Sequence, residues 1–158
     1  MATTLDQIVD LFMSFVSDFR LTTIYQTSGS SIFQTYIEPW VIGAVVDFSK
    51  VCDQSLNYSQ ATQSFDTDLT LENQFCLAQI TVKYWAQKVV QDITQINVYI
   101  KDHDFDRHSE NSNFTAKQAY YIAKIEEIDH MLSVYAYDRN DWNLWYQQNF
   151  GQAIINNP

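Results

Sequence analysis

The sequence feature that most constrains the fold is a long amphipathic stretch over residues 70 to 101. Apolar side chains recur in it at alternating steps of three and four, the period of one helical face. Asp68 and Thr70 are residue types that cap helix N-termini, and Glu72 would complement the helix dipole in the first turn. About thirty residues at 1.5 Å each give a helix of roughly 45 Å. Such a helix is either the spine of a bundle or one strut of an oligomer. The apolar row comprises Leu71, Phe75, Ala78, Val82, Trp85, Val89, Ile96 and Tyr99.

Composition supports a helical core around this stretch. The chain has 158 residues, of which 46% are hydrophobic and 15% aromatic, enough to bury one core. Three glycines and two prolines leave little material for a turn-rich β-sandwich or barrel. The sequence therefore predicts a mainly α fold, a helical bundle around one long central helix. We expect a single helical domain over residues 1–137 and an aromatic C-terminal segment over residues 138–158.

The remaining segments divide into helices and connectors. Residues 4–19 predict a first helix, because Thr4 and Gln7 have capping-box spacing before an apolar face. Residues 32–52 predict a second helix with Pro39 near its first turn, and residues 114–137 predict a last one. Polar connectors are expected over residues 53–67 and 102–113. Residues 20–31 combine β-leaning side chains with a Ser-Gly-Ser-Ser loop signal, so they predict a short β-hairpin or extended arm.

Charge and hydropathy indicate whether the partner of this chain is a nucleic acid, a membrane or another protein. The formal charge of −10 and the absence of a basic stripe argue against nucleic acid as the main ligand. Acidity either keeps the protein dispersed or matches a basic surface on a partner protein. A charged fraction of only 18%, together with many Tyr and Trp residues, is typical of an interface. We find neither a signal peptide nor a membrane span, so the expected location is cytoplasmic.

Two groups of residues suggest metal binding. Glu127 and His130 form a Glu-x-x-His pair, the spacing used by di-iron bundles, but those proteins need a second pair and two further glutamates. The loop 102–108 carries Asp102, His103, Asp104, Asp106 and His108, yet it lacks the glycine and the final glutamate of an EF-hand. Chance and a solvated loop explain these patterns better than a metal site. We expect no metal and no cofactor.

Catalytic motifs are absent as well. Cys52 and Cys76 lie outside any recognisable nucleophile motif and are expected to be free thiols, although a disulfide between them is not excluded by their spacing. No phosphate-cradling glycine loop and no GxSxG motif occurs. The sequence predicts a protein that is not an enzyme.

Aromatic residues supply the candidate interface. Trp142, Trp145, Tyr146 and Phe150 would largely share one helical face. They either close the domain's own core or dock on a neighbouring subunit, where Trp and Tyr are favoured hot spots. Tyr25, in the expected arm, is a further candidate. Asp92 interrupts the apolar row of the long helix, which indicates either a slip of that face toward solvent or a polar group that sets the register of an oligomer.

These elements resemble a known class of proteins. The run DLTLENQFCLAQITVKYWAQKVVQDI, followed by KDHDFDRHSENSNF and another helix, is similar to small virion proteins of tailed bacteriophages. The pattern covers residues 5–137 and resembles head–tail connector, adaptor or neck proteins. The resemblance implies a homo-oligomeric ring seated on the portal and in contact with other neck or tail proteins. DNA would pass through its channel without sequence-specific binding, and no membrane would be involved.

Three functions follow as expectations. The first is a structural virion protein at the phage head–tail junction, assembled in the host cytoplasm, or another tail or baseplate protein. The second is a cytoplasmic helical-bundle module that binds one protein partner. The third, weakest, is a metal-dependent bundle enzyme that uses Glu127 and His130.

Overall fold

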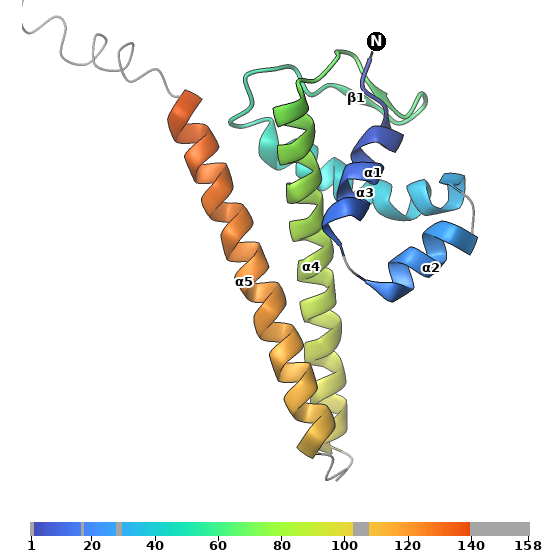
Figure 1. Cartoon of the computed structure of the whole chain (residues 1–158), viewed down its shortest axis with the longest axis vertical. Coiled ribbons are helices and arrows are strands. Elements are labelled where there is room, and N and C mark those ends of the chain that lie inside the picture. Colours follow the sequence, from blue (N-terminus) through green and yellow to red (C-terminus); the bar gives the residue numbers. More distant parts are fainter. Residues whose placement is uncertain (1, 17, 28–29, 103–107, 140–158) are drawn as a thin grey trace, which may run out of the picture.

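The structure is a computed structural model that describes residues 2–16, 18–27, 30–102 and 108–139. Within these ranges the chain is mainly helical, with one small antiparallel hairpin, which confirms the predicted fold class (Figure 1). The elements are α1 (Leu5–Phe15), α2 (Phe19–Thr27), α3 (Ser30–Phe48), β1 (Tyr58–Ser59), β2 (Ser64–Phe65), α4 (Leu71–Asp102) and α5 (His108–Arg139).

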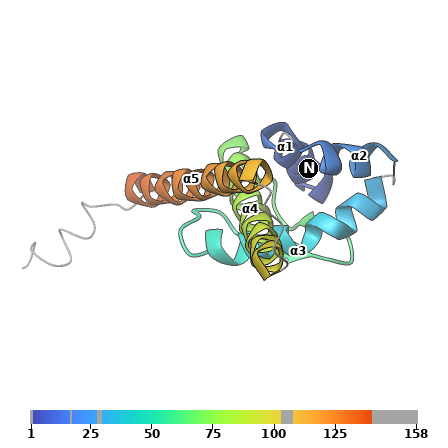
Figure 2. The same cartoon turned by 90° about the horizontal axis from the view of Figure 1, so that it is seen from below.

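Helix α4 is the spine of the fold, with bounds one residue from those predicted. Its N-terminus is capped by Thr70, whose Oγ1 accepts a hydrogen bond from the Asn73 backbone N–H at 3.3 Å. Helices α1, α3 and α5 all pack against α4 (Figure 2). Every side chain from Cys76 to Val82 is consequently buried. The first two members of the predicted row, Leu71 and Phe75, instead lie exposed.

Helices α1 and α3 supply most of the core opposite α4. At Gly43, helices α3 and α4 approach so closely that a Cβ atom at this position would lie 3.1 Å from the Tyr84 ring. The Tyr84 hydroxyl donates to Asp47 Oδ2 at 2.9 Å and ties the end of α3 to the same place. The largest fully buried side chains are Phe12, Phe33, Phe48, Phe65, Leu5, Ile8, Ile37, Leu77, Ile80, Ile128, Val9 and Val41.

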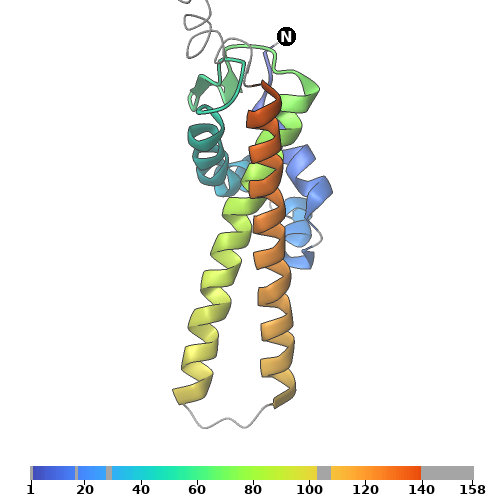
Figure 3. The same cartoon turned by 90° about the vertical axis from the view of Figure 1, so that its left-hand side faces the viewer.

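Helix α5 returns alongside α4 and forms a long helical hairpin with it (Figures 1 and 3). Tyr121, Ile128 and Tyr135 are its buried residues, spaced seven apart as in a coiled-coil seam. Figure 3 shows the lower half of this hairpin extending beyond the body formed by the other helices. Among the described residues, no helix is long and apolar enough to cross a membrane.

The small β-hairpin formed by β1 and β2 joins the N-terminal segment to the start of α4. Tyr58 pairs with Phe65, and Ser59 pairs with Ser64. The Thr3 carbonyl accepts from the Phe65 N–H at 2.8 Å, and the Thr3 N–H donates to the Thr67 carbonyl at 3.2 Å. The connector predicted over residues 53–67 therefore contains the only sheet found in the described residues.

The prediction of a β-hairpin or arm over residues 20–31 is wrong, because α2 occupies Phe19–Thr27 and α3 begins at Ser30. Asp18 caps α2, with Oδ1 accepting from the Leu21 N–H at 3.3 Å. Leu21 is buried and Ile24 half-buried, which is a helical spacing. Burial of this pair outweighs the β preference of the intervening threonines.

Further boundaries differ from the prediction. Helix α1 ends at Phe15 rather than at residue 19, and α3 ends at Phe48 rather than at residue 52. Pro39 lies in the interior of α3 rather than near its first turn, because the helix begins nine residues earlier, at Ser30. Helix α5 begins at His108, so residues 108–113 are helical rather than part of a polar loop. It ends at Arg139, two residues beyond the expected domain limit, and residues 140–158 lie outside the described ranges.

Candidate docking surface

Helix α3 is apolar around its whole circumference. Glu38 and Asp47 are the only charged side chains in its 19 residues. One face is fully buried and consists of Phe33, Ile37, Val41, Ala44 and Phe48. A helix that is apolar on all sides is normally enclosed on all sides. On the other face of α3, Ile32, Tyr36 and Val46 lie exposed.

The N-terminal half of that exposed face forms what we call the α3 stripe, defined by Ile32, Tyr36 and Pro39. Ile32 is 64% exposed and Tyr36 is 49% exposed. The Tyr36 ring packs edge-on against half-buried Trp40, with the centroids 5.1 Å apart. The stripe thus combines an aromatic ring, supported from beside the stripe by Trp40, with an aliphatic side chain. Aromatic residues are enriched in the cores of protein interfaces.

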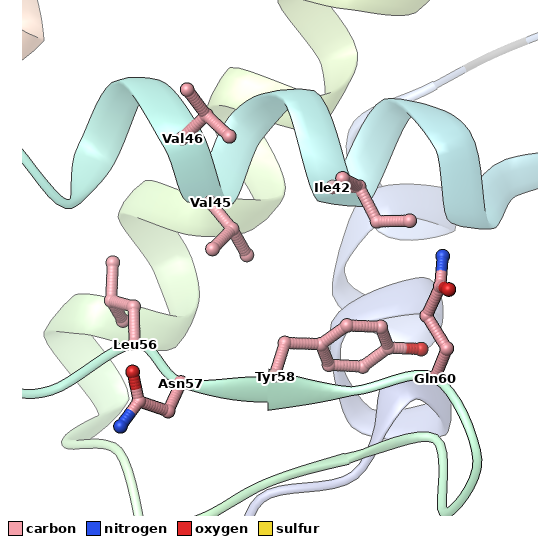
Figure 4. A pocket seen from close by; sticks show the side chains of 7 residues that line it. All are labelled: Ile42, Val45, Val46, Leu56, Asn57, Tyr58 and Gln60. Carbon is pink, nitrogen blue, oxygen red and sulfur yellow. The ribbon is translucent and has the colours of Figure 1, made fainter.

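Beside the C-terminal half of α3 lies an open groove of about 590 Å³ (Figure 4). Its two walls are α3 and the segment that leads through β1, with the buried Leu56 on one wall and Val46, 57% exposed, on the other. None of the lining residues in the described part of the chain carries a charge. They are Ile42, Val45, Val46, Leu56, Asn57, Tyr58 and Gln60.

One hydrogen bond ties the two walls together. The Tyr58 hydroxyl donates to Glu38 Oε1 at 2.8 Å, across from β1 to α3. Burial and the neighbouring carboxylate raise the pKa of Tyr58 well above its ordinary value, so the hydroxyl keeps its proton at neutral pH. The groove is therefore a feature held by the fold rather than a gap between independent segments.

A second exposed apolar surface lies on α5. Its members, which we call the α5 outer face, point away from the buried row: Ile122, Val134 and Tyr137. Exposed Glu126, Glu127 and His130 lie among them. Tyr120 is also exposed, but it lies beside the buried row, against the Tyr121 ring and in a small pocket with Trp85. Viewed along the bundle, α5 and α3 lie on different sides of α4 (Figure 2). The chain thus presents two separate apolar surfaces.

The C-terminal end of α5 is held by charged groups. Arg139 Nη2 lies 2.8 Å from Glu72 Oε2, and Arg139 Nε donates to Asp53 Oδ2 at 3.1 Å. The guanidinium also stacks 3.9 Å from the centroid of the Tyr135 ring. The Glu72 carboxylate and then Asp53 raise the pKa of Arg139, which stays charged. These contacts fix where the chain leaves the body.

A buried amide completes this attachment. Asn73 is fully buried, and its Nδ2 donates to Asp53 Oδ1 at 2.9 Å and to Gln54 Oε1 at 2.7 Å. The Tyr135 hydroxyl lies 2.6 Å from Asn73 Oδ1 and 3.1 Å from Asp53 Oδ1, both of them acceptors. The hydrogen bond from Asn73, followed by that from Arg139, lowers the pKa of Asp53.

The predicted interface residues fall in different places. Tyr25 lies on α2, where its hydroxyl donates to Asp10 Oδ1 at 3.0 Å and its ring packs against Phe33 of the buried face of α3. Asp92 does not occupy a buried seam: its side chain is 49% exposed and pairs with Lys88. A register-setting role for Asp92 in an assembly stays a prediction. The aromatic residues Trp142, Trp145, Tyr146 and Phe150 lie outside the described ranges.

The candidate metal and thiol residues that the structure describes lie apart from one another. Glu127 pairs with Lys124 at 3.0 Å, and His130 lies exposed one turn further on. No group of three or more metal-ligating side chains occurs in the part of the chain that the structure describes, and residues 103–107 lie outside it. Cys52 and Cys76 are free thiols, as predicted. Burial raises the pKa of Cys76 to about 11, so it is protonated at neutral pH.

Sequence reasoning missed the α3 stripe and the groove. A signal for them was present in the sequence: the 19 residues of α3 contain only two charged side chains, and apolar residues occur around the whole helix. We find no family model, curated protein or solved structure that matches this chain.

Proposed function

We propose that this chain is a structural assembly protein whose copies pack side by side in a ring, at the head–tail junction of a tailed bacteriophage. The supporting observation is the presence of two apolar surfaces, the α3 stripe and the α5 outer face, on different sides of α4. A ring built from identical copies needs two different patches that meet head to tail. The phage setting, with a portal as the seat of the ring, rests on the sequence resemblance.

The chemistry of the two surfaces suits such a contact. Fully burying a side chain such as Ile32 or Val134 contributes about 1.5–3 kcal/mol. The polar groups among the α5 residues would form the hydrated rim that surrounds an interface core. A standard interface covers about 800 Å² on each partner, so residues around the stripe would contribute as well.

The net charge suits a ring that surrounds DNA. At −10 the chain repels phosphate rather than binding it, so a polymer would slide through without being held. Acidic side chains on the inner wall would serve this purpose, whereas the uncharged α3 stripe would lie between subunits.

A second candidate is a module that binds one protein partner. It would need only one of the two surfaces, and the groove beside α3 favours it as a preformed site. The two functions differ in stoichiometry, since a module forms a one-to-one complex, whereas a ring protein associates with itself in a closed series.

The test uses two single-surface variants of the full chain. Ile32→Asp blocks the α3 stripe, and Val134→Asp blocks the α5 outer face; both side chains are exposed, so neither change opens the core. We expect the wild type to form oligomers larger than a dimer by native mass spectrometry at micromolar concentrations. Each variant alone should be monomeric, and an equimolar mixture should stop at a heterodimer, because each copy keeps one working surface.

Other outcomes contradict the ring. A wild type that remains monomeric at every concentration, alone and with a portal ring, would overturn it in favour of the binding module. Oligomers that both variants still form would show that other surfaces mediate the contact. Exposed Gln95→Asp, on α4 away from both surfaces, is the charge-matched control and should assemble normally.

A further inference from the structure

Beyond its role in assembly, the structure points to an occupant for the groove beside α3. We propose that the C-terminal segment of the same chain, residues 140–158, folds back and places its aromatic side chains in this groove. The inference does not depend on the proposed ring, because it concerns the single chain.

The first argument is proximity. Arg139 donates to Asp53 Oδ2 at 3.1 Å, and Leu56, on the groove wall, follows Asp53 by three residues. Three residues of chain span at most roughly 10 Å. The 19 residues after Arg139 can reach about 60 Å when extended, so every part of the groove lies within their range.

The second argument is the anchor itself. The bidentate pair of Arg139 with Glu72, the bond to Asp53 and the stacking on Tyr135 fix the start of the segment at the end of the body that carries the groove. A tethered segment has an effective concentration on the order of millimolar at such a nearby site. A second copy at micromolar concentration competes poorly with it, which is why we assign the groove to the segment of the same chain.

The third argument is chemical complementarity. The described residues that line the groove are uncharged, and they are aliphatic apart from Asn57, Tyr58 and Gln60. The segment carries a single charged side chain, Asp141, in a protein of net charge −10. Its apolar side chains would bury the exposed face of Val46, while its glutamines and asparagines meet the polar residues at the groove margin. The large apolar members are Trp142, Leu144, Trp145, Tyr146, Phe150, Ile154 and Ile155.

Hydrogen exchange read by mass spectrometry tests this on the full chain. We expect amides in residues 140–158 to be protected at least about tenfold relative to an unstructured peptide. The protection should not change with protein concentration, since the contact is intramolecular. Val46→Asp should abolish it, whereas Ile32→Asp, a matched change on the same helix outside the groove, should leave it intact.

The reciprocal experiment changes the segment. The double variant Trp142→Ser and Trp145→Ser should speed exchange at residues 56–60 while amides of residues 76–82 keep their protection. Gln147→Ala with Gln148→Ala is the control and should have no effect. Circular dichroism verifies that each variant keeps its helices.

Three results would overturn the inference. An unprotected C-terminal segment in the wild type would show that nothing of this chain fills the groove. Protection that disappears on dilution would assign the groove to the segment of a second copy. Protection that survives Val46→Asp would place the segment elsewhere. None of these results bears on whether the chain forms rings, which Ile32→Asp and Val134→Asp test separately.

Discussion

At the scale of single residues, the attachment of α5 depends on polar groups drawn from three separate parts of the sequence. Asn73 is fully buried, yet both ends of its amide have partners, so it carries no desolvation penalty. Asp53, Tyr135 and Arg139 meet around it. Nothing in the spacing of these residues along the chain indicates that they meet, which is why the sequence did not reveal the cluster.

The cost of breaking this cluster can be measured with Tyr135→Phe. The change removes the hydroxyl 2.6 Å from Asn73 Oδ1 and leaves that buried acceptor without its donor. We expect the free energy of unfolding in urea to fall by about 1–3 kcal/mol. Tyr120→Phe, at an exposed position on the same helix, should change it by less than about 0.5 kcal/mol. Equal effects of the two changes would show that the hydroxyl contributes nothing specific.

Asp53 makes the stability of the fold sensitive to acid. Its pKa is lower in the folded chain than in the unfolded one, because Asn73 and Arg139 stabilise the carboxylate. The unfolded state therefore takes up the proton first as the pH falls. The contribution of Asp53 is complete above its unfolded pKa of about 3.9 and is lost as the pH falls through the lower, folded value.

Asp53→Asn tests this dependence. Urea unfolding of wild type and variant should differ most near neutral pH, and the difference should shrink below about pH 4. Asp47, whose pKa is also lowered, chiefly by Lys50, remains in both proteins and cancels in the comparison. A difference that is constant down to the acid transition would exclude linkage through Asp53.

At the scale of elements, α4 and α1 were predictable, whereas the β1–β2 hairpin and α2 were not. The start of α4 follows from Thr70 and from a row of apolar residues, both of which are local signals. The β1–β2 hairpin was not predicted because its turn contains no glycine. Gln63 adopts a positive φ of 48°, a conformation that glycine usually provides in such turns. Helix α2 was misassigned because burial of Leu21 outweighs the β preference of its neighbours.

In α3, too, burial of side chains outweighs a local preference, in this case the preference of Pro39 against a helix interior. A proline in a helix interior removes one backbone hydrogen bond and costs about 3 kcal/mol. The helix continues through it because the buried row on both sides, Ile37 and Val41 included, packs against the core.

Pro39→Ala should therefore stabilise the chain. The variant regains a backbone donor for the carbonyl four residues earlier, and the gain exceeds the added entropy of the unfolded state, about 1 kcal/mol at most. We expect an increase of about 1–2 kcal/mol in the free energy of unfolding. Thermal and urea melts provide the measurement. A destabilised variant would mean that the bend imposed by proline is needed for packing.

At the scale of the whole molecule, α5 is held less strongly than the body, which consists of α1, α2, α3 and the part of α4 that they cover. Helix α4 is surrounded by three helices over residues 76–82, whereas α5 packs chiefly on α4 alone. The two long helices also continue beyond the body, where they have only each other (Figure 3). Such an arrangement predicts that α5 opens before the body unfolds.

Native-state hydrogen exchange should show this order. Amides of residues 115–135 should exchange through an opening that costs less free energy than the one that exposes residues 76–86. Ile128→Ala, at a fully buried position, should lower the protection of α5 by about 2–5 kcal/mol, with a smaller effect on α4. Ile122→Ala on the exposed side is its control. Equal losses in both helices would mean that the chain opens as one unit.

The long helical hairpin of α4 and α5 also gives the molecule two ends that can be told apart. Thr3 bonds to residues just before α4, and Arg139 bonds to Glu72 in the first turn of that helix, so both lie at one end of the molecule (Figure 1). The C-terminal end of α4 and the N-terminal end of α5 lie at the opposite end (Figure 1). An electron-dense tag placed beside Thr3 would therefore mark one pole of an elongated particle. In micrographs of an assembly, that mark would tell which way each copy points.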